Sequence, residues 1–212
     1  MQDHDDFATE PLPGLPALPP KGEVLLWQGR PDPWALACEA FGLIWVAGYF
    51  VALAVWRAWA VADSVGQVAA VMLPYLVIGA LTCGILFGIA WITARGTVYT
   101  LTTARIAMRI GAALMVTLNL PYSQIGNASL DLRRRGTGTI AVETLGETRL
   151  SWLVCWPHVR PWAMSRTQPA LRCIPDAARV AQMLAEAAET RINQPVISRM
   201  PAQTSTSAIA AE

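Results

Sequence analysis

A long uncharged run constrains this chain more than any other feature of its sequence. From Ser64 to Ala94, 31 consecutive positions contain no Asp, Glu, Lys or Arg. A helix of roughly 20 apolar residues is long enough to cross the hydrocarbon core of a bilayer, and a soluble domain of ordinary size has no need of such a run. We therefore predict a membrane-spanning helix at residues 66–93.

A second apolar segment precedes this run and predicts another span at residues 35–56, so that residues 34–94 form a two-helix transmembrane hairpin. Trp34 and Trp56 stand at the two ends of this segment, where amphipathic rings favour the membrane interface. Glu39 lies about one turn inside the span. It is interpreted either as a carboxylate that reaches the headgroups or is protonated, or as a polar contact to a partner helix.

The charges predict how the hairpin is oriented. Residues 95–191 contain twelve arginines and six acids, whereas the turn at 57–65 contains a single arginine. Basic segments beside a membrane stay cytoplasmic, so we expect an inner (intracytoplasmic) membrane protein with both termini in the cytoplasm. The chain begins with acids and has no apolar core in its first 30 residues, so we expect no secretory signal peptide.

The segments that flank the hairpin differ in composition and in hydrophobic pattern. Residues 1–21 are acidic and proline-rich, and residues 193–212 are polar and aperiodic; both predict disordered tails. Residues 22–33 form a pre-membrane segment, in which residues 24–27 are a short strand or an interfacial segment. Residues 95–192 contain short β-forming segments about ten residues apart, which predict a cytoplasmic antiparallel β-domain. The candidate strands are residues 97–101, 105–109, 114–120, 130–132, 139–142, 147–153 and 171–174.

The predicted β-domain ends in one amphipathic helix. Pro175 occupies a favoured first helical position, and Asp176 follows in the first turn. Val180, Met183 and Leu184 then recur at helical spacing, so one face of the helix is apolar and packs on the sheet.

Two blocks that flank the hairpin resemble those of bacterial pleckstrin-homology-like domains in small membrane proteins: GEVLLWQG at 22–29 and YTLTTAR at 99–105. This resemblance implies a small antiparallel pleckstrin-homology-like fold after the hairpin. Two further blocks, WPHVRPW at 156–162 and QPALRCIP at 168–175, resemble the PuhB-type photosynthetic-complex assembly proteins of purple bacteria. That resemblance, over roughly residues 20–190, implies a non-enzymatic scaffold that holds reaction-centre subunits during assembly, with the H subunit as the first expected partner.

The tryptophan-rich segment is the main candidate site. Its prolines at 157 and 161 exclude an ordinary helix or a central strand. Three interpretations remain open: docking on a partner or on headgroups, packing over the β-domain as core, and pigment ligation through His158 as a weak cofactor-binding candidate. The partner-docking candidates are Trp152, Trp156, His158, Arg160 and Trp162.

Small residues predict a close helix contact. Ala80, Gly84 and Gly88 recur at a spacing of four on the second span, and Gly48 and Ala52 form a matching stripe on the first. Small residues at this spacing let helix backbones approach closely. The stripe is interpreted as packing within the hairpin, or as the seam of a homodimer or partner contact.

Arg133, Arg134 and Arg135 form the densest charge cluster, which is either a solvated hairpin tip or a contact to lipid headgroups. These arginines are not interleaved with stacking aromatics, so nucleic acid is not an expected partner. No catalytic motif is visible, and Cys155 with His158 supplies two of the four ligands of a structural zinc site, so we expect neither an enzyme nor a cofactor. A lipid-headgroup-binding or stress-related membrane module is the alternative function, and a membrane enzyme with an unrecognised site is a third.

Overall fold

The computed structural model describes residues 19–20, 22–111, 115–133, 136–145, 150–161, 163 and 166–192. Most of the first predicted tail and all of the second lie outside these residues. The strands are β1 (Leu25–Gly29), β2 (Val98–Thr102), β3 (Arg105–Ile110), β4 (Val116–Pro121), β5 (Ile125–Leu132), β6 (Thr137–Thr144) and β7 (Ala170–Pro175). The helices are α1 (Pro33–Glu39), α2 (Leu43–Val61), α3 (Val65–Gly96), the 3-10 turn η1 (Tyr122–Gln124), α4 (Trp152–Cys155) and α5 (Ala177–Ile192).

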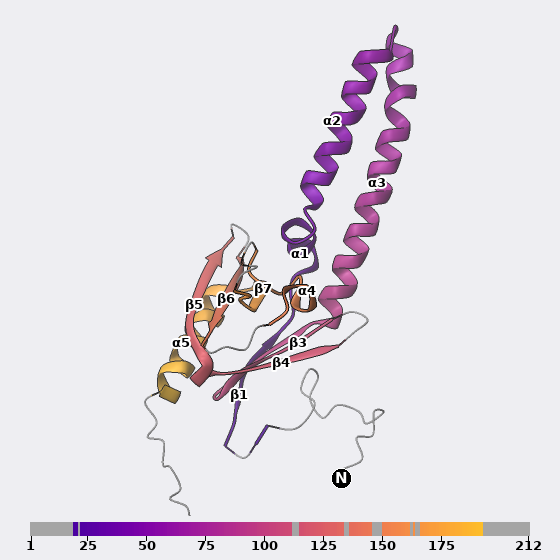
Figure 1. The fold of residues 1–212 in the computed structure, drawn as a ribbon. Helices are drawn as coiled ribbons and strands as arrows, with labels where there is room; N and C mark the ends of the chain where they lie inside the picture. Colours follow the sequence, from indigo (N-terminus) through magenta and orange to yellow (C-terminus); the bar gives the residue numbers. More distant parts are fainter. Residues whose placement is uncertain are drawn as a thin grey trace, which may run out of the picture.

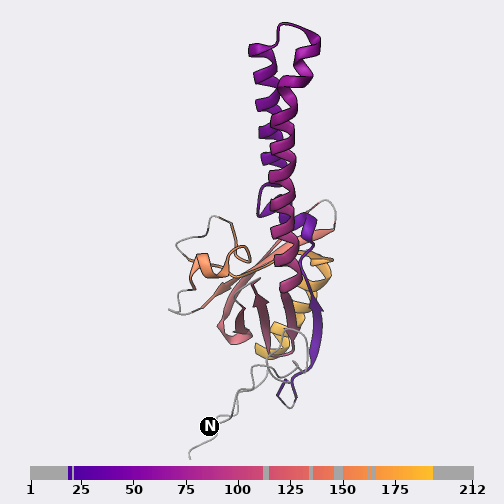
Figure 2. The same cartoon turned by 90° about the vertical axis from the view of Figure 1, so that its right-hand side faces the viewer.

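Helices α2 and α3 form a long hairpin that projects away from the β-domain (Figure 1, Figure 2). Both are long and apolar enough to cross a membrane, and only 11% and 6% of their most apolar windows are buried inside the fold. The predicted second span at 66–93 lies within α3. Apolar side chains therefore cover the outside of this hairpin. Its end beside the β-domain is called the hairpin base below.

The first predicted span begins too early. Residues 33–39 form the separate short helix α1, and α2 begins only at Leu43. The break falls at Gly42, whose φ of 65° lies in the left-handed region that glycine adopts without steric cost. Asp32 starts α1, because its Oδ1 accepts a hydrogen bond from the backbone N–H of Ala35 at 2.7 Å.

Glu39 consequently lies on α1 and not one turn inside a membrane-spanning helix, which corrects its predicted position. Its Oε1 is 3.4 Å from Nε of Arg133 at the end of β5. The carboxylate thus joins α1 to the β5–β6 hairpin across the domain surface.

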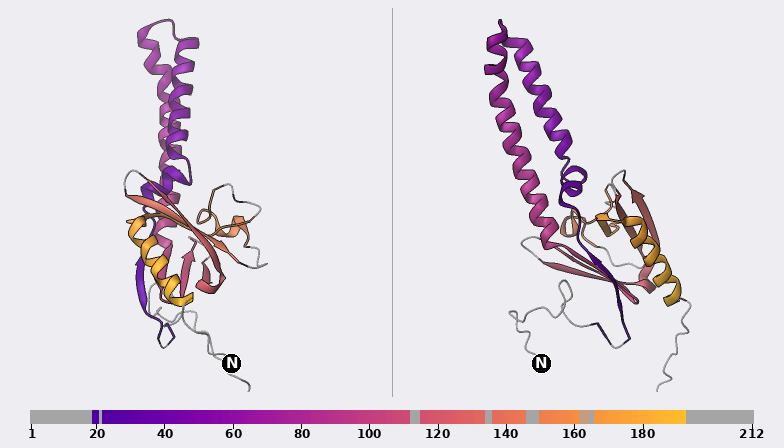
Figure 3. Two further views of the ribbon diagram at one scale, coloured as in Figure 1. Left: turned by 90° about the vertical axis from the view of Figure 1, so that its left-hand side faces the viewer. Right: turned by 180° about the vertical axis from the view of Figure 1, so that it is seen from behind.

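The β-domain contains two antiparallel sheets, ordered β1-β2-β3-β4 and β5-β6-β7 (Figure 3). β1 lies before the apolar hairpin in the chain and β2 after it, yet the two are paired neighbours, with Trp27 opposite Leu101 and Gly29 opposite Tyr99. The apolar hairpin is therefore an insertion between two adjacent strands. The β-domain therefore consists of the predicted residues 95–192 together with β1 from the pre-membrane segment. Both ends of the hairpin are attached to one sheet.

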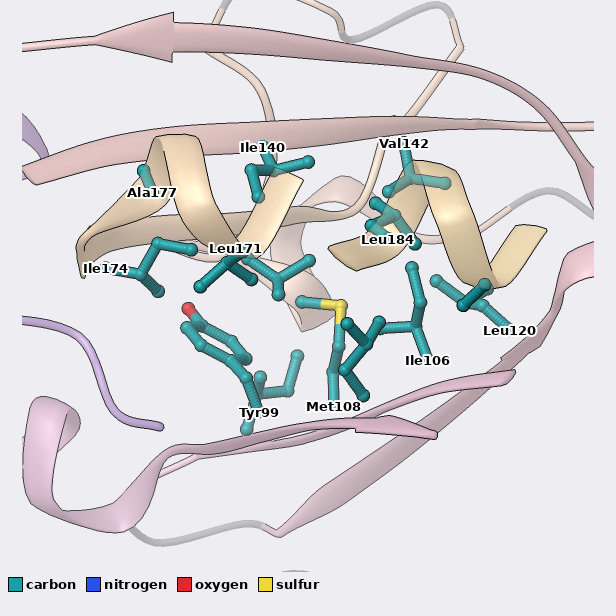
Figure 4. Close-up of a cluster of buried hydrophobic side chains, with 14 of the residues drawn as sticks. Tyr99, Ile106, Met108, Leu120, Ile140, Val142, Leu171, Ile174, Ala177 and Leu184 are labelled. Carbon is teal, nitrogen blue, oxygen red and sulfur yellow. The ribbon is translucent and has the colours of Figure 1, made fainter. Parts of the chain in front are cut away.

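The core lies where the two sheets and α5 meet (Figure 4). Tyr99, Ile106 and Met108 come from the first sheet, while Ile140 and Leu171 come from the second, and all five are fully or almost fully buried. Burying one such apolar side chain contributes about 2 kcal/mol. α5 closes the core with its apolar stripe of Val180, Leu184 and Ala187, which confirms the predicted amphipathic helix.

One strand prediction and the predicted start of the last helix differ from the structure. The segment predicted as a strand at 147–153 contributes Trp152 and Leu153 to the one-turn helix α4, and its residues 147–149 lie outside the described residues. Pro175 ends β7 and does not start α5, because Asp176 adopts a left-handed φ of 51° that separates the strand from the helix. The remaining candidate strands overlap β2 to β7.

Candidate functional site at the hairpin base

Helix α4 presents two apolar side chains to the outside of the domain. Trp152 and Cys155 are three residues apart and therefore share one face of the single turn. That face packs on the domain core, where Cys155 is buried. Leu153 and Val154 point the other way and are 80% and 56% exposed. The turn thus anchors itself with one face and offers an apolar surface with the other.

Trp156 joins this surface to the hairpin base. Its ring stands edge-on to Phe41, in the link between α1 and α2, with ring centroids 5.2 Å apart and planes at 77°. Trp156 remains 40% exposed. Edge-to-face aromatic pairs contribute about 1 kcal/mol beyond their buried area, so this contact fixes the tryptophan-rich segment against the start of the apolar hairpin.

Further aromatic side chains lie at the same end of the hairpin. Trp34 on α1 packs against Phe87 on α3 at 6.0 Å between ring centroids. Trp91 on α3 holds the guanidinium of Arg95 at 4.0 Å above its ring. We call these residues, together with Phe41 and Trp156, the aromatic girdle. A girdle of this kind suits the boundary between hydrocarbon and water.

His158 does not belong to the exposed surface, since only 1% of it is accessible. Its Nδ1 lies 2.6 Å from the hydroxyl of Tyr99, and its Nε2 lies 3.1 Å from Oγ1 of Thr97. The Tyr99 hydroxyl accepts a hydrogen bond from the backbone N–H of Arg172 at 3.3 Å. Its own proton is therefore available for Nδ1 of His158.

The hydrogen bonds determine the tautomer of His158. Because Nδ1 accepts from Tyr99, the ring proton sits on Nε2 and is donated to Thr97. Thr97 in turn donates to the carbonyl oxygen of Thr93 in the last turn of α3, at 2.8 Å. This chain of hydrogen bonds, which we call the histidine network, ties the end of α3 to β2, β7 and the tryptophan-rich segment.

The electrostatics of the histidine network keep the imidazole neutral. Burial lowers the pKa of His158 to about 3, and the nearby Arg172 guanidinium acts in the same direction. Burial also raises the pKa of the Tyr99 hydroxyl far above its usual value. Both ring nitrogens are occupied, so His158 has no lone pair for a pigment metal. Pigment ligation and direct partner docking through His158 are therefore wrong, and core packing is correct for this residue.

The other predicted site residues are only partly brought together. Arg160 is exposed, and its Nη1 donates to Oε1 of Gln168 at 3.1 Å. Arg133 pairs with Glu39 and with Asp131 at 3.2 Å, so it is not simply a solvated tip residue. Trp162, Arg134 and Arg135 lie outside the described residues.

The small-residue stripe does not pack within the hairpin. A side chain at Gly48, Gly84 or Gly88 would meet nothing within 4 Å, and Ala52 and Ala80 are exposed. The close approach of α2 and α3 occurs at Gly79, one position before Ala80. An added Cβ at Gly79 would lie 2.7 Å from Cβ of Phe50. The stripe faces away from the helix contact, because the rotation of α3 brings Gly79 rather than Gly84 toward α2.

Sequence reasoning missed three residues that build the site: Tyr99, Phe41 and Arg172. Tyr99 stood in a strand block and Phe41 inside a predicted span. Arg172 stood in a candidate strand, where an arginine side chain is expected to face solvent. The only sequence signal was Gly42 directly after Phe41, because glycine marks helix ends.

The comparisons with known proteins agree with this architecture. The family model described as "Bacterial PH domain" matches residues 36–188. A protein of Rhodobacter capsulatus, described as an uncharacterized 23.7 kDa protein in the puhA 5′ region, is 44% identical over 207 residues, covering 95% of each chain. No solved structure matches the chain. With most of its length matched by the model, this chain belongs to the bacterial PH-domain family.

Proposed function

We propose that the protein is a non-enzymatic membrane assembly factor for the photosynthetic reaction centre, which holds subunits while the complex is built. Two observations support this role. The relative in the puhA 5′ region covers nearly the whole chain, and the WPHVRPW block resembles photosynthetic-complex assembly proteins. The H subunit is the first partner to test.

The observation that carries the proposal is the exposed apolar surface on α4 next to the hairpin base. We call Leu153, Val154 and Trp156 the docking surface. Aromatic and aliphatic anchors beside a rigid scaffold are the residues that dominate protein–protein binding. Removing Leu153 and Val154 from water would contribute about 2 kcal/mol each. α4 and the aromatic girdle hold these side chains in place, so little entropy is lost when a partner binds.

Removing the docking surface is expected to abolish co-purification while leaving the protein folded. We expect the variant Leu153→Ser/Val154→Ser to accumulate normally, because both side chains point away from the core. Affinity-tagged protein from photosynthetically growing cells should then recover at least tenfold less reaction-centre H subunit. The reason is that the binding free energy loses roughly 2 kcal/mol or more from apolar surface that is no longer buried.

The matched control is Leu145→Ser, a leucine that is 59% exposed and follows β6 at the opposite end of the β5–β6 hairpin from Arg133. Equal recovery of reaction-centre subunits by the docking variant and the control would contradict the role of α4. Normal reaction-centre levels in a deletion strain grown photosynthetically would contradict the assembly function as a whole.

The proposed topology places α2 and α3 across the inner membrane, with the β-domain and both termini in the cytoplasm. It follows from the twelve arginines after the hairpin and from the pairing of β1 with β2, which holds both hairpin ends on one side. In a variant without native cysteines, Asp63→Cys should react with a membrane-impermeant maleimide from the periplasm, and Leu132→Cys should not. The reverse labelling pattern would refute this orientation.

A further inference from the structure

A pocket on the outer face of the β5-β6-β7 sheet gathers arginines beneath α1. It encloses about 310 Å³, and its polar lining includes Glu39, Asp131, Arg133, Arg160 and Arg172. These side chains come from α1, β5, β7 and the segment after α4, which are far apart in sequence. We call this cavity the arginine pocket.

The charges in the arginine pocket do not cancel. Glu39 and Asp131 both pair with Arg133, at 3.4 and 3.2 Å. Neither Arg160 nor Arg172 has a carboxylate partner among the described residues. The guanidinium groups of Arg160 and Arg172 therefore line the pocket without a carboxylate partner among the described residues, and one positive charge remains after the three arginines and two carboxylates are counted.

Arg172 is the unusual member of this group, because only 5% of it is exposed. Its Nη1 donates to the carbonyl oxygen of Pro157 at 3.1 Å, while its Nε has no hydrogen-bond partner in the described part of the chain. A buried charge without an opposite charge is costly. An anion in the pocket would supply the missing compensation.

The position of the arginine pocket indicates where the anion comes from. An adjoining groove of about 410 Å³ shares Glu39 and Arg133 with the pocket and continues to Trp34 and Ile44. Ile44 lies on the exposed surface at the start of α2, and the end of β5 reaches the height of α1 (Figure 1). The lining thus changes from apolar side chains at the hairpin base to guanidinium groups in the domain.

We propose that the arginine pocket binds the phosphate of an anionic phospholipid headgroup, with the glycerol end of the lipid in the adjoining groove. Guanidinium groups bind phosphate oxygens through charge-assisted, often bidentate, hydrogen bonds. Arg160 and Arg172 supply these donors, and Arg133 remains held by its two carboxylates. The site stands independently of any role in reaction-centre assembly, since it requires only the membrane.

The test measures binding of short-chain phosphatidylglycerol to the purified full-length protein in a neutral detergent, by native mass spectrometry and thermal stabilisation. Arg160→Gln should weaken binding about tenfold, because one hydrogen bond to a charged group is lost, and should not unfold the exposed site. The matched control Arg166→Gln, an exposed arginine outside the pocket, should bind like the wild type.

Two comparison ligands identify the source of the anion. Phosphatidylcholine, whose headgroup carries a compensating cation, should bind at least tenfold more weakly than phosphatidylglycerol, and inorganic phosphate should not displace the lipid at equal concentration. Equal binding by the Arg160→Gln and Arg166→Gln variants would overturn the proposal. So would equal binding of the two lipids, or binding of inorganic phosphate as tight as that of phosphatidylglycerol.

Discussion

Replacing His158 by alanine is expected to destabilise the β-domain by about 3 kcal/mol. The change leaves a cavity in a packed interior and removes the acceptor of the Tyr99 hydroxyl and the donor to Thr97. Buried polar groups without partners cost about 1–3 kcal/mol each. Thermal unfolding of the full-length protein in detergent, followed by tryptophan fluorescence, should show a clearly lower midpoint. An unchanged midpoint would mean that the histidine network is not formed in solution.

The same histidine predicts a pH dependence whose sign follows from its lowered pKa. In the unfolded chain His158 binds a proton at its ordinary pKa of 6.5, whereas in the fold it does so only near pH 3. Between these values the unfolded state binds more protons, so stability is full above pH 6.5 and falls as the pH drops toward 3. Between these two pKa values the free energy of unfolding changes by about 1.4 kcal/mol per pH unit. His158→Gln, which does not titrate, should lose this part of the pH dependence; a slope identical to that of the wild type would contradict the assignment.

Replacing Gly79 by leucine is expected to disrupt the apolar hairpin. An added Cβ at this position lies 2.7 Å from Cβ and 2.9 Å from Cγ of Phe50. Phe50 Cβ is attached to the α2 backbone and cannot rotate away, so the helices must separate. Overpacking costs about 1–3 kcal/mol even where atoms can adjust, and small residues at such contacts are what let the helices approach. The amount of protein in the membrane fraction and its unfolding midpoint should both fall.

The control for this prediction is Gly84→Leu on the same helix. A side chain there meets nothing within 4 Å, so the monomer should accumulate and unfold as the wild type does. If the two variants behave alike, the rotation of α3 described here is wrong. If Gly84→Leu alone reduces crosslinking between copies, the stripe is a seam between protomers.

Much of the architecture follows from local patterns in the sequence. The charge-free run at 64–94 predicts α3, because length and apolarity are properties of one continuous segment. The apolar spacing after residue 177 predicts the buried face of α5, because a helix repeats every 3.6 residues whatever it packs against. The prolines at 157 and 161 likewise predicted an irregular tryptophan-rich segment, and α4 is no more than one turn.

Contacts between distant segments were decided only by the tertiary structure. Nothing local in residues 25–29 specifies β2 as their partner across the whole hairpin, and nothing near Glu39 specifies Arg133. Burial of His158 required β2, β7 and the end of α3 to converge on one ring.

Which glycine of α3 contacts α2, Gly79 or Gly84, depends on how α3 is rotated about its own axis relative to α2. Periodicity identifies stripes on a helix, but it does not identify which stripe faces the neighbour when every side is apolar. The sequence therefore determined most of the elements of this protein and the apolar face of α5, but not the break between α1 and α2 or the helix α4. The tertiary structure determined which faces meet, because that choice depends on complementary shape and charge summed over residues far apart in the chain.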